Sequence, residues 1–434
     1  MRVAFLFNAP RAWDWPGFLQ GEIGLSGTDA QVLKTSHNLS YRDGIDVLLL
    51  QNQATTPHPR LRCLQVSTAD EAFEAASAER VDVLVFNNRG DDNTCALLAA
   101  CQRGGQRSVV WDQNGPSDVM ANLIADCPAA KRLVCVSAVQ TDLIRHHRVF
   151  DKTELIYNSI DPLFFYTKAG HRDPKHVVYV GCLVFSKGFH LLAAAWPAVH
   201  AAIPDATLSV LGSARLHDDG AELGPLGVAA ADYEQRYIAP YLGTDREACA
   251  ALGVRFRGLV SPAEIRDELQ SASVGVVNPH TANFTELFCV SAAEIEASGA
   301  AVIGGRASGL FESVRNGRSG LLVSGQHELS QALIALLNDP ARAAAMGQFG
   351  QRFVAGTYAP GRNTDRWAQL LLDVVCEREA QPPPLRIAHV NGRVLLRESL
   401  RRGRGVPWVG KHVPTLEALR RARADLRSLI AKVS

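Results

Sequence analysis

Three glutamates stand in one mostly apolar stretch of the chain. The segment FTELFCVSAAEIEASGAAVIGG covers residues 284–305, and within it Glu286 and Glu294 have seven residues between them. In a continuous helix, residues at this spacing lie about 80° apart in rotation and about 12 Å apart along the axis. The two carboxylates then either reach opposite ends of one elongated polar ligand or both face water. The spacing alone leaves both interpretations open.

A lysine and a polar turn elsewhere in the chain are further candidates for a ligand site. Lys187 stands in FSKG, which lacks the GxxxxGK[ST] order of a Walker loop. In GLSGTDAQ, residues 24–31, Thr28 and Gln31 have the spacing of a helix capping box. No GxGxxG follows the first apolar run, which argues against a dinucleotide-dependent oxidoreductase.

The elements that must position these side chains alternate along the chain. Short apolar runs, typical of strands buried on both faces, are separated by helical patterns. The predicted strands of the first half are 3–7, 46–51, 81–87, 108–112 and 132–137. Those of the second half are 176–181, 206–212, 253–258, 274–279, 300–305 and 320–323. This order predicts an α/β protein with two Rossmann-like, doubly wound domains, and a ligand site in the cleft at the carboxyl ends of the strands.

Length and composition agree with two domains and an appendage. A chain of 434 residues exceeds one ordinary hydrophobic core. With 47% hydrophobic residues and a formal net charge of +1, the composition is that of a soluble globular protein. We place the domains at 1–165 and 166–355, a helix returning to the first domain at 356–380, and an extension at 381–434.

The extension is basic and begins after a proline run. The prolines of QPPP, residues 381–384, forbid a helix and favour an extended linker. Beyond it an amphipathic helix is predicted, with an apolar stripe formed by Leu419, Ala422, Leu426, Leu429 and Val433. Its charges are either solvated on a helix packed against the body, or they contact anionic lipid headgroups through Arg401, Arg402 and Arg404. Nucleic acid is not expected as a partner, because zinc spacing, a stacking motif and a helix-turn-helix pattern are missing.

The cysteines and the amino terminus indicate a reducing compartment. Nine cysteines are scattered along the chain without a CxxC pair, so we expect free thiols and no structural zinc. The amino terminus lacks the apolar core of a signal peptide, and no uncharged apolar run of about 18 residues occurs. We therefore expect a cytoplasmic protein, in one alternative held at the inner face of the membrane by the basic extension.

The second half of the chain resembles the retaining, nucleotide-sugar-dependent glycosyltransferases of family four, which have the GT-B fold. The Glu-x7-Glu signature of that family matches Glu286 and Glu294. Three further segments are similar to the strands, turns and closing loop of the family in the same order. They are VVYVGCLVFSKGFHLL, GVRFRGLVSPAEI and SGLFESVRNGRSGLLV. The resemblance covers residues 130–325 well, residues 1–130 loosely, and nothing beyond Gln381.

The resemblance implies a role for each of the leading candidates. Glu286 would hold hydroxyls of the donor sugar, and Glu294 would accept hydrogen bonds from the ribose hydroxyls, since a carboxylate accepts from two hydroxyls at once. Lys187 would neutralise charge on the leaving diphosphate. The helix that begins near Phe288 and Cys289 would present its amides and positive dipole end to the same anion.

One departure from the family concerns the cation after the turn glycine Gly181. The family usually has arginine there, whereas this chain has Cys182, which carries no positive charge. Either Arg257 or Arg306 supplies the missing charge, or donor binding is weaker or altered.

Other departures concern the sugar end of the site. Where many members have histidine after the fourth strand of the first domain, this chain has WDQNGPSD, and Asn114 is our candidate for the sugar hydrogen bond. Leu287 replaces the glycine that commonly follows the first Glu, which reduces backbone freedom. The remaining candidates for donor binding are Gly27, Thr28, Gly258 and His280.

The resemblance predicts a glycosyltransferase that moves a hexose-like sugar from a nucleotide-diphosphate donor, UDP and GDP among the candidates, with retention of anomeric configuration. No cofactor or metal is expected, and the acceptor is a glycan, a lipid-linked molecule or a small molecule. Two alternatives stay open. One is a sugar-nucleotide epimerase or hydrolase on the same fold, and the other is a non-catalytic protein that binds nucleotide sugars.

Overall fold

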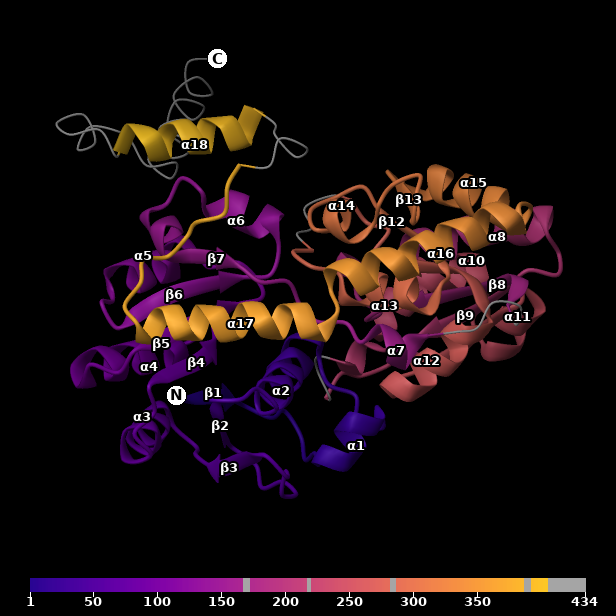
Figure 1. Ribbon diagram of the computed structural model, residues 1–434. Helices are drawn as coiled ribbons and strands as arrows, with labels where there is room; N and C mark the ends of the chain where they lie inside the picture. The colour runs from indigo at the N-terminus through magenta and orange to yellow at the C-terminus, as the bar shows by residue number, and fades with distance from the viewer. Residues whose placement is uncertain (167–171, 217–219, 282–285, 386–391, 405–434) are drawn as a thin grey trace, which may run out of the picture.

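The computed structural model describes residues 1–166, 172–216, 220–281, 286–385 and 392–404. Two α/β domains lie side by side in it, each built around its own parallel sheet (Figure 1). The prediction of two doubly wound domains is therefore confirmed. The amphipathic helix predicted between Leu419 and Val433 lies outside the described residues.

The first domain holds a seven-stranded sheet in the order β3-β2-β1-β4-β5-β6-β7. Its strands are β1 (Arg2–Phe7), β2 (Asp46–Gln51), β3 (Leu61–Gln65), β4 (Val83–Asn87), β5 (Ser108–Asp112), β6 (Ala130–Cys135) and β7 (Thr153–Leu155). The helices of this domain are α1 (Trp15–Gln20), α2 (Gly27–Leu39), α3 (Ala69–Ala78), α4 (Asp92–Gly104), α5 (Asp118–Asp126) and α6 (Ala138–Ile144). The chain order reverses at β1, which pairs with β2 on one side and β4 on the other, and a ligand crevice is expected at such a point.

The second domain holds a six-stranded sheet in the order β10-β9-β8-β11-β12-β13. Its strands are β8 (Asp173–Val180), β9 (Thr207–Leu211), β10 (Val254–Gly258), β11 (Ala272–Val277), β12 (Ala301–Gly305) and β13 (Gly320–Val323). Its helices include α8 (Phe189–Ala202), α11 (Arg246–Ala251), α12 (Pro262–Ser271), α13 (Val290–Ser298), α14 (Leu310–Ser313), α15 (Gln326–Leu337) and α16 (Pro340–Thr357). Short helices α7 (Pro162–Phe165), α9 (Ala231–Tyr233) and α10 (Ala239–Leu242) complete the two domains.

Sequence prediction found eleven of these thirteen strands within a few residues and missed β3 and β7. Both missed strands lie at the edges of the first sheet. Strand β3, with the sequence LRCLQ, is only partly buried, and β7 has three residues. Edge strands bury fewer side chains, so they lack the continuous apolar run that identifies a central parallel strand.

Helix α13 begins at Val290 with Cys289 as its N-cap, close to the predicted start near Phe288 and Cys289, so Glu286 precedes the helix and Glu294 lies within it. One local prediction beside the site was wrong. At α2 the N-cap is Ser26, whose hydroxyl accepts from the backbone N–H of Asp29, whereas Thr28 lies inside the helix. The side chain of Gln31 is used instead to pair with the backbone of Ser159, in the segment that leads out of the first domain.

Helices α17 (Pro360–Val375) and α18 (Gly392–Arg404) both return to the first domain (Figure 1). In α17, the ring of Trp367 packs edge-on against Trp111 and Phe5. In α18, the buried carboxylate of Glu398 binds Arg401 and Arg402 of its own helix. These contacts hold α17 against the sheet and neutralise the buried acid of α18.

The arginines proposed for lipid contact are engaged within the protein. Arg401 and Arg402 bind Glu398, and Arg404 donates a hydrogen bond to the backbone carbonyl of His146. Within the described residues, no helix combines the length and the apolar character needed to cross a bilayer.

Candidate active site

A cavity of about 600 Å³ lies between the two domains. Its walls come from the residues that follow β4, β5, β8, β9 and β11, and from the first turns of α2 and α13. The carboxyl ends of both parallel sheets therefore open into one space, as expected for a ligand site of this architecture.

Ten of the residues predicted for the site line this cavity. They are Gly27, Thr28, Asn114, Gly181, Cys182, Lys187, Glu286, Phe288, Cys289 and Glu294. Four others lie outside its lining, namely Arg257, Gly258, His280 and Leu287. The structure thus brings together the two glutamates and the lysine, although they are separated by up to 107 positions in the chain.

Lys187 and Glu286 form an ion pair at the cavity wall. The lysine Nζ lies 2.7 Å from Oε2 of the carboxylate, and the side chains are 25% and 15% exposed. Burial lowers the pKa of Lys187, but the charge and the hydrogen bond of Glu286 outweigh it, so the pKa is raised above its usual value. The lysine is therefore a fixed positive charge in a partly dehydrated site, where it interacts strongly with an anion.

A glycine turn brings Lys187 to this position. The short 3-10 helix Phe185–Lys187 ends at Gly188, which has a φ of 75°. A Cβ atom on Gly188 would lie 2.7 Å from the backbone nitrogen of His280, in the loop after β11. Only glycine permits both this backbone conformation and this close approach.

The N-terminal end of α13 lines the same wall. Its N-cap residue, Cys289, makes no side-chain capping hydrogen bond to the first turn, and Val290 and Ser291 line the cavity. Burial raises the pKa of the Cys289 thiol, so the thiol stays neutral. A helix end with backbone N–H groups free of a capping side chain, beside a lysine, is a suitable environment for a phosphate oxygen.

Glu294 reaches the cavity from the second turn of α13. Burial raises the pKa of its carboxyl, and the positive charge of Lys34 on α2 partly offsets this effect. Lys34 also lines the cavity, so the two side chains face the same space from opposite domains. Lys34 escaped sequence prediction because a lysine on an amphipathic helix is usually solvent-facing.

The missing arginine is not replaced by either of the predicted residues. Arg257 pairs with Glu268 at 3.2 Å, and Arg306 donates to the carbonyl of Leu322 at 2.6 Å; neither lines the cavity. Cys182 is buried, donates from Sγ to the carbonyl of Ser213 at 3.2 Å, and has its pKa raised to about 11 by burial.

The lysine and arginine side chains that do line the cavity, within the described part of the chain, are Lys34, Arg89 and Lys187. Two of the three therefore belong to the first domain, on the side opposite the missing arginine.

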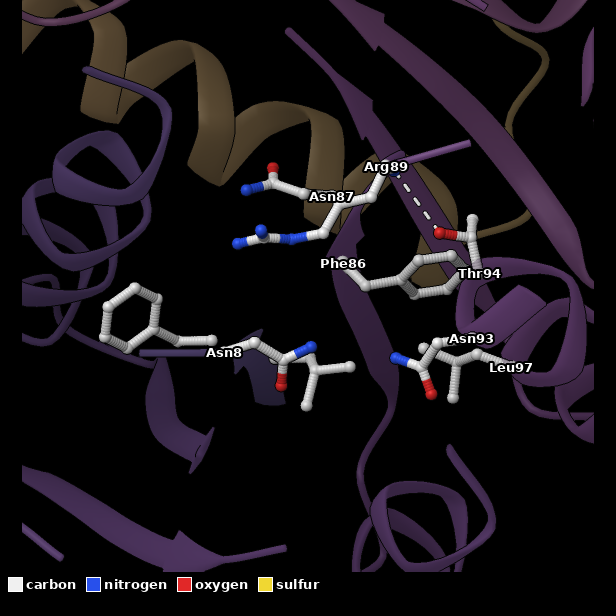
Figure 2. A pocket seen from close by; sticks show the side chains of 9 residues that line it. Asn8, Phe86, Asn87, Arg89, Asn93, Thr94 and Leu97 are labelled. Atoms are coloured by element: carbon white, nitrogen blue, oxygen red, sulfur yellow. Dashed lines mark hydrogen bonds between the residues drawn. The ribbon is translucent and has the colours of Figure 1, made fainter. Parts of the chain in front are cut away.

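Arg89 connects the main cavity with a smaller one. Its guanidinium binds Asp29 at 2.7 Å, and its backbone N–H donates to Thr94. The smaller cavity, about 20 Å³, lies where β1 and β4 end, and Figure 2 shows Arg89 beside Asn87 there. Arg89 therefore lines both cavities.

Asn114 is held at the cavity by a turn centred on Asp112. The Oδ1 atom of Asp112 accepts from the backbone N–H groups of Asn114 at 3.3 Å and Gly115 at 3.0 Å. Asp112 is fully buried, and burial raises its pKa to about 7 despite these hydrogen bonds. The turn after β5 is thus preorganised from within the first domain.

His280 belongs to an aromatic cluster beside the cavity. Its ring lies 5.2 Å from Phe185 and 5.3 Å from His190, and its side chain is buried. His280 therefore packs against Phe185, in the turn that carries Lys187. Leu287 is likewise buried, and Gly258 has a φ of 72° at the end of β10.

Comparison with known proteins finds matches to the second domain in sequence and to both domains in fold. Residues 174–339 match the family described as "Glycosyl transferases group 1". The D-inositol 3-phosphate glycosyltransferase of Corynebacterium glutamicum is 32% identical over 176 residues, which are 40% of this chain and 38% of that protein. Both matches agree with the resemblance of the second half of the chain to the family-four glycosyltransferases.

A second relative comes from the same species. The GDP-mannose-dependent monoacylated alpha-(1-6)-phosphatidylinositol monomannoside mannosyltransferase is 31% identical over 198 residues, which are 44% of this chain and 46% of that protein. The chain spans less than half of the length of either curated relative.

Solved GT-B structures match almost the whole described fold. HepE of Anabaena, in complex with UDP and glucose, aligns with a TM-score of 0.62 at 16% identity over 86% of this chain and all of that one. Sucrose-phosphate synthase of Thermosynechococcus elongatus aligns with a TM-score of 0.66 at 17% identity, over 87% and 99%. At these identities the likeness shows the GT-B fold.

Proposed function

We propose that this protein transfers a hexose-like sugar from a nucleotide-diphosphate donor to an acceptor bound in the cleft, with retention of anomeric configuration and without a metal. The observation that carries the proposal is the ion pair of Lys187 and Glu286, 2.7 Å apart, on the wall of a cavity that is also lined by the start of α13. A cation, a helix N-terminus and a carboxylate match the diphosphate and the sugar of one donor.

The donor would lie across the ends of the second sheet. Lys187 and the first amides of α13 would hold the diphosphate, Glu286 the sugar hydroxyls and Glu294 the ribose hydroxyls. The apolar end of the cavity, which includes Leu259, Val260, Pro262 and Ile265, would take the base. Lys34 would face the donor from the first domain and supply part of the charge that Cys182 lacks.

The proposed reaction exchanges one glycosidic bond for another. The bond from the anomeric carbon to the diphosphate oxygen breaks while Lys187 and the helix end stabilise the departing charge. The acceptor hydroxyl attacks the same face of the sugar, and its proton passes to a departing phosphate oxygen. Closure of the two domains would exclude water, which otherwise competes with the acceptor.

Known proteins favour this donor class and leave its base open. HepE of Anabaena was solved with UDP-glucose as well as with UDP. The mannosyltransferase relative is named as dependent on GDP-mannose. UDP-glucose and GDP-mannose are therefore the first donors to test.

Binding and turnover of these donors test the proposal. Thermal shifts with UDP, GDP, UDP-glucose and GDP-mannose identify the base, because a ligand that binds the native state raises the melting temperature. Glu286→Ala should then abolish transfer to an acceptor panel while the protein keeps its fold. Lys175→Ala is a suitable control, since Lys175 forms an ion pair with Asp205 on the surface away from the cavity.

Incubation with donor alone separates the rival activities. If the donor is epimerised or hydrolysed at a rate that an acceptor does not increase, the protein is an epimerase or a hydrolase and not a transferase. Tight binding without turnover over the acceptor panel would instead leave a nucleotide-sugar-binding protein. A chelator should leave the rate of transfer unchanged, and a loss of activity that divalent metal restores would contradict the metal-independent mechanism.

A further inference from the structure

Asn278 is a buried amide in contact with the carboxylate of Glu286. It follows β11 directly, is 4% exposed, and lines the cavity. Its Nδ2 atom donates to Oε2 of Glu286 at 2.5 Å and lies 3.6 Å from Sγ of Cys289. One amide thus joins the carboxylate to the first residue of the α13 cap.

The backbone at Asn278 is constrained to aim this amide. Its φ is 37°, a left-handed conformation that side chains other than those of Asn and Asp rarely adopt. Its carbonyl accepts from the N–H of Gly305 at 3.1 Å, and a Cβ on Gly305 would lie only 2.7 Å from that carbonyl oxygen. The turn therefore depends on a close approach of the ends of β11 and β12.

Both donors to Glu286 reach the same carboxylate oxygen. Lys187 and Asn278 donate to Oε2, and the backbone carbonyl of Glu286 accepts from Gly309 at 2.6 Å. Within the described residues, no hydrogen bond reaches Oε1. This oxygen is therefore available to hydroxyl donors, provided that the carboxylate keeps its orientation.

We propose that Asn278 is a positioning residue for the sugar end of the donor site, an inference that rests on the proposed function. When a diphosphate draws the ammonium of Lys187 toward itself, the Lys187–Glu286 pair weakens, because the anion competes for the same cation. The amide of Asn278 carries no charge and does not respond to the phosphate. It keeps Oε2 bound, so that Oε1 continues to face the hydroxyls of the sugar.

Substitution by glycine and by aspartate tests this role. Asn278→Gly removes the amide but permits the left-handed backbone, so relief of the strained φ partly offsets the lost hydrogen bond and the protein should still fold. Asn278→Asp keeps the shape but places an acceptor, and a second negative charge, against Glu286. Arg80→Gly is the matched control, because exposed Arg80 also has a positive φ, of 53°, and lies outside the cavity lining.

The expected result is a difference between nucleotide and nucleotide sugar. In calorimetry, Asn278→Gly should bind UDP or GDP within about twofold of the wild type and should bind UDP-glucose or GDP-mannose at least 10-fold more weakly. In the transfer assay its kcat should fall at least 10-fold. Asn278→Asp should lower the affinity for the nucleotide sugar and kcat further than Asn278→Gly does. The acid limb of its pH–rate profile should also move to higher pH, because two adjacent carboxyl groups share a proton.

Each contrary outcome has a distinct meaning. If Asn278→Gly weakens the binding of nucleotide and of nucleotide sugar equally, Asn278 has only a structural role. The same conclusion follows if its kinetics lie within twofold of those of Arg80→Gly. A wild-type protein that neither binds nor turns over a nucleotide sugar would remove the proposed function, and the positioning role with it. Transfer by the wild type together with unaltered transfer by Asn278→Gly would remove this inference alone.

Discussion

The charges of the cavity are arranged in opposed pairs at the scale of single residues. Lys187 faces Glu286, Arg89 binds Asp29, and Lys34 lies near Glu294. Lys187 and Arg89 each form an ion pair with a carboxylate of the protein, whereas Lys34 acts on Glu294 through its charge. A diphosphate would compete with these carboxylates for the cations, and the released carboxylates would then accept hydrogen bonds from the donor hydroxyls.

Substitution of Lys34 tests whether the first domain supplies the missing charge. A charge-assisted hydrogen bond contributes about 1.5–3 kcal/mol. We expect Lys34→Ala to weaken donor binding about 10- to 100-fold and to reduce its dependence on salt. Calorimetry at two salt concentrations measures both effects, with Lys175→Ala as the control. Donor affinity within twofold of the wild type would show that Lys34 contributes no charge to the donor.

Glu296 makes stability dependent on pH. It is fully buried in α13, neither carboxyl oxygen has a hydrogen-bond partner among the described residues, and burial raises its pKa to about 8 despite the nearby Ser319 and Arg315. Because the folded pKa lies above the unfolded value, its contribution to stability is complete below about pH 4.5. It is lost progressively as the pH rises to 8.

Glu296→Gln should remove this dependence. One pH unit corresponds to about 1.4 kcal/mol for a single group, so the melting temperature of the variant should exceed that of the wild type by a margin that grows from pH 5 to pH 8. Asp112 titrates with the same sign in both proteins and cancels in the difference. Parallel curves of melting temperature against pH for the two proteins would contradict a raised pKa at Glu296.

Short turns after the strands of the second sheet, rather than its long helices, position the site at the scale of elements. The Lys187 turn, the Asn278 turn and the Glu286 segment approach one another through Gly188, Gly305 and Gly309. At each of these glycines a Cβ would lie within 2.7 Å of a backbone atom of a neighbouring turn. Because the turns are in such close contact, a shift in the backbone of one turn displaces the next.

Gly188→Ala should disturb the site through its turn. The Cβ would meet the backbone of His280, and a left-handed alanine costs about 1–2 kcal/mol. We expect a lower melting temperature and at least a 10-fold loss of turnover, because Lys187 is displaced from Glu286. Gly361→Ala in α17 is the control, since nothing lies within 4 Å of its Cβ. If Gly188→Ala were as active as Gly361→Ala, the turn at Gly188 would not be needed to position the site.

The two domains are joined by a carboxylate at the scale of the whole molecule. Glu312 of α14 in the second domain is buried and accepts from the backbone N–H groups of Ala138 and Val139 in α6 of the first domain. The hydroxyl of Tyr157 donates to the same carboxylate. Glu312 thus satisfies N–H groups at the start of a helix that its own domain does not contain.

Glu312→Gln should loosen the domains from each other. A Gln amide offers one acceptor oxygen where the carboxylate offers two, so a buried N–H loses its partner at a cost of about 1–3 kcal/mol. Calorimetric unfolding should start at a lower temperature and resolve into two transitions. Tyr157→Phe, which removes one donor and leaves both backbone contacts, should change less. A single transition at the wild-type temperature would show that Glu312 does not couple the domains.

The sequence by itself determined the architecture and the leading members of the site. Central parallel strands are buried on both faces, so they appear as apolar runs that can be read locally. The segments that carry Lys187, Glu286 and Glu294 have a local order that is similar to a known family, and the structure places all three residues on one cavity.

Only the tertiary structure decided which other residues join them. Arg257 and Arg306 are as basic as Lys34, and nothing near them in the chain reveals that they bind Glu268 and Leu322 instead of facing the cavity. Asn278 likewise depends on a strand end 27 positions away. The physical reason is that the direction of a side chain follows from the packing of elements distant in sequence, which no local pattern contains.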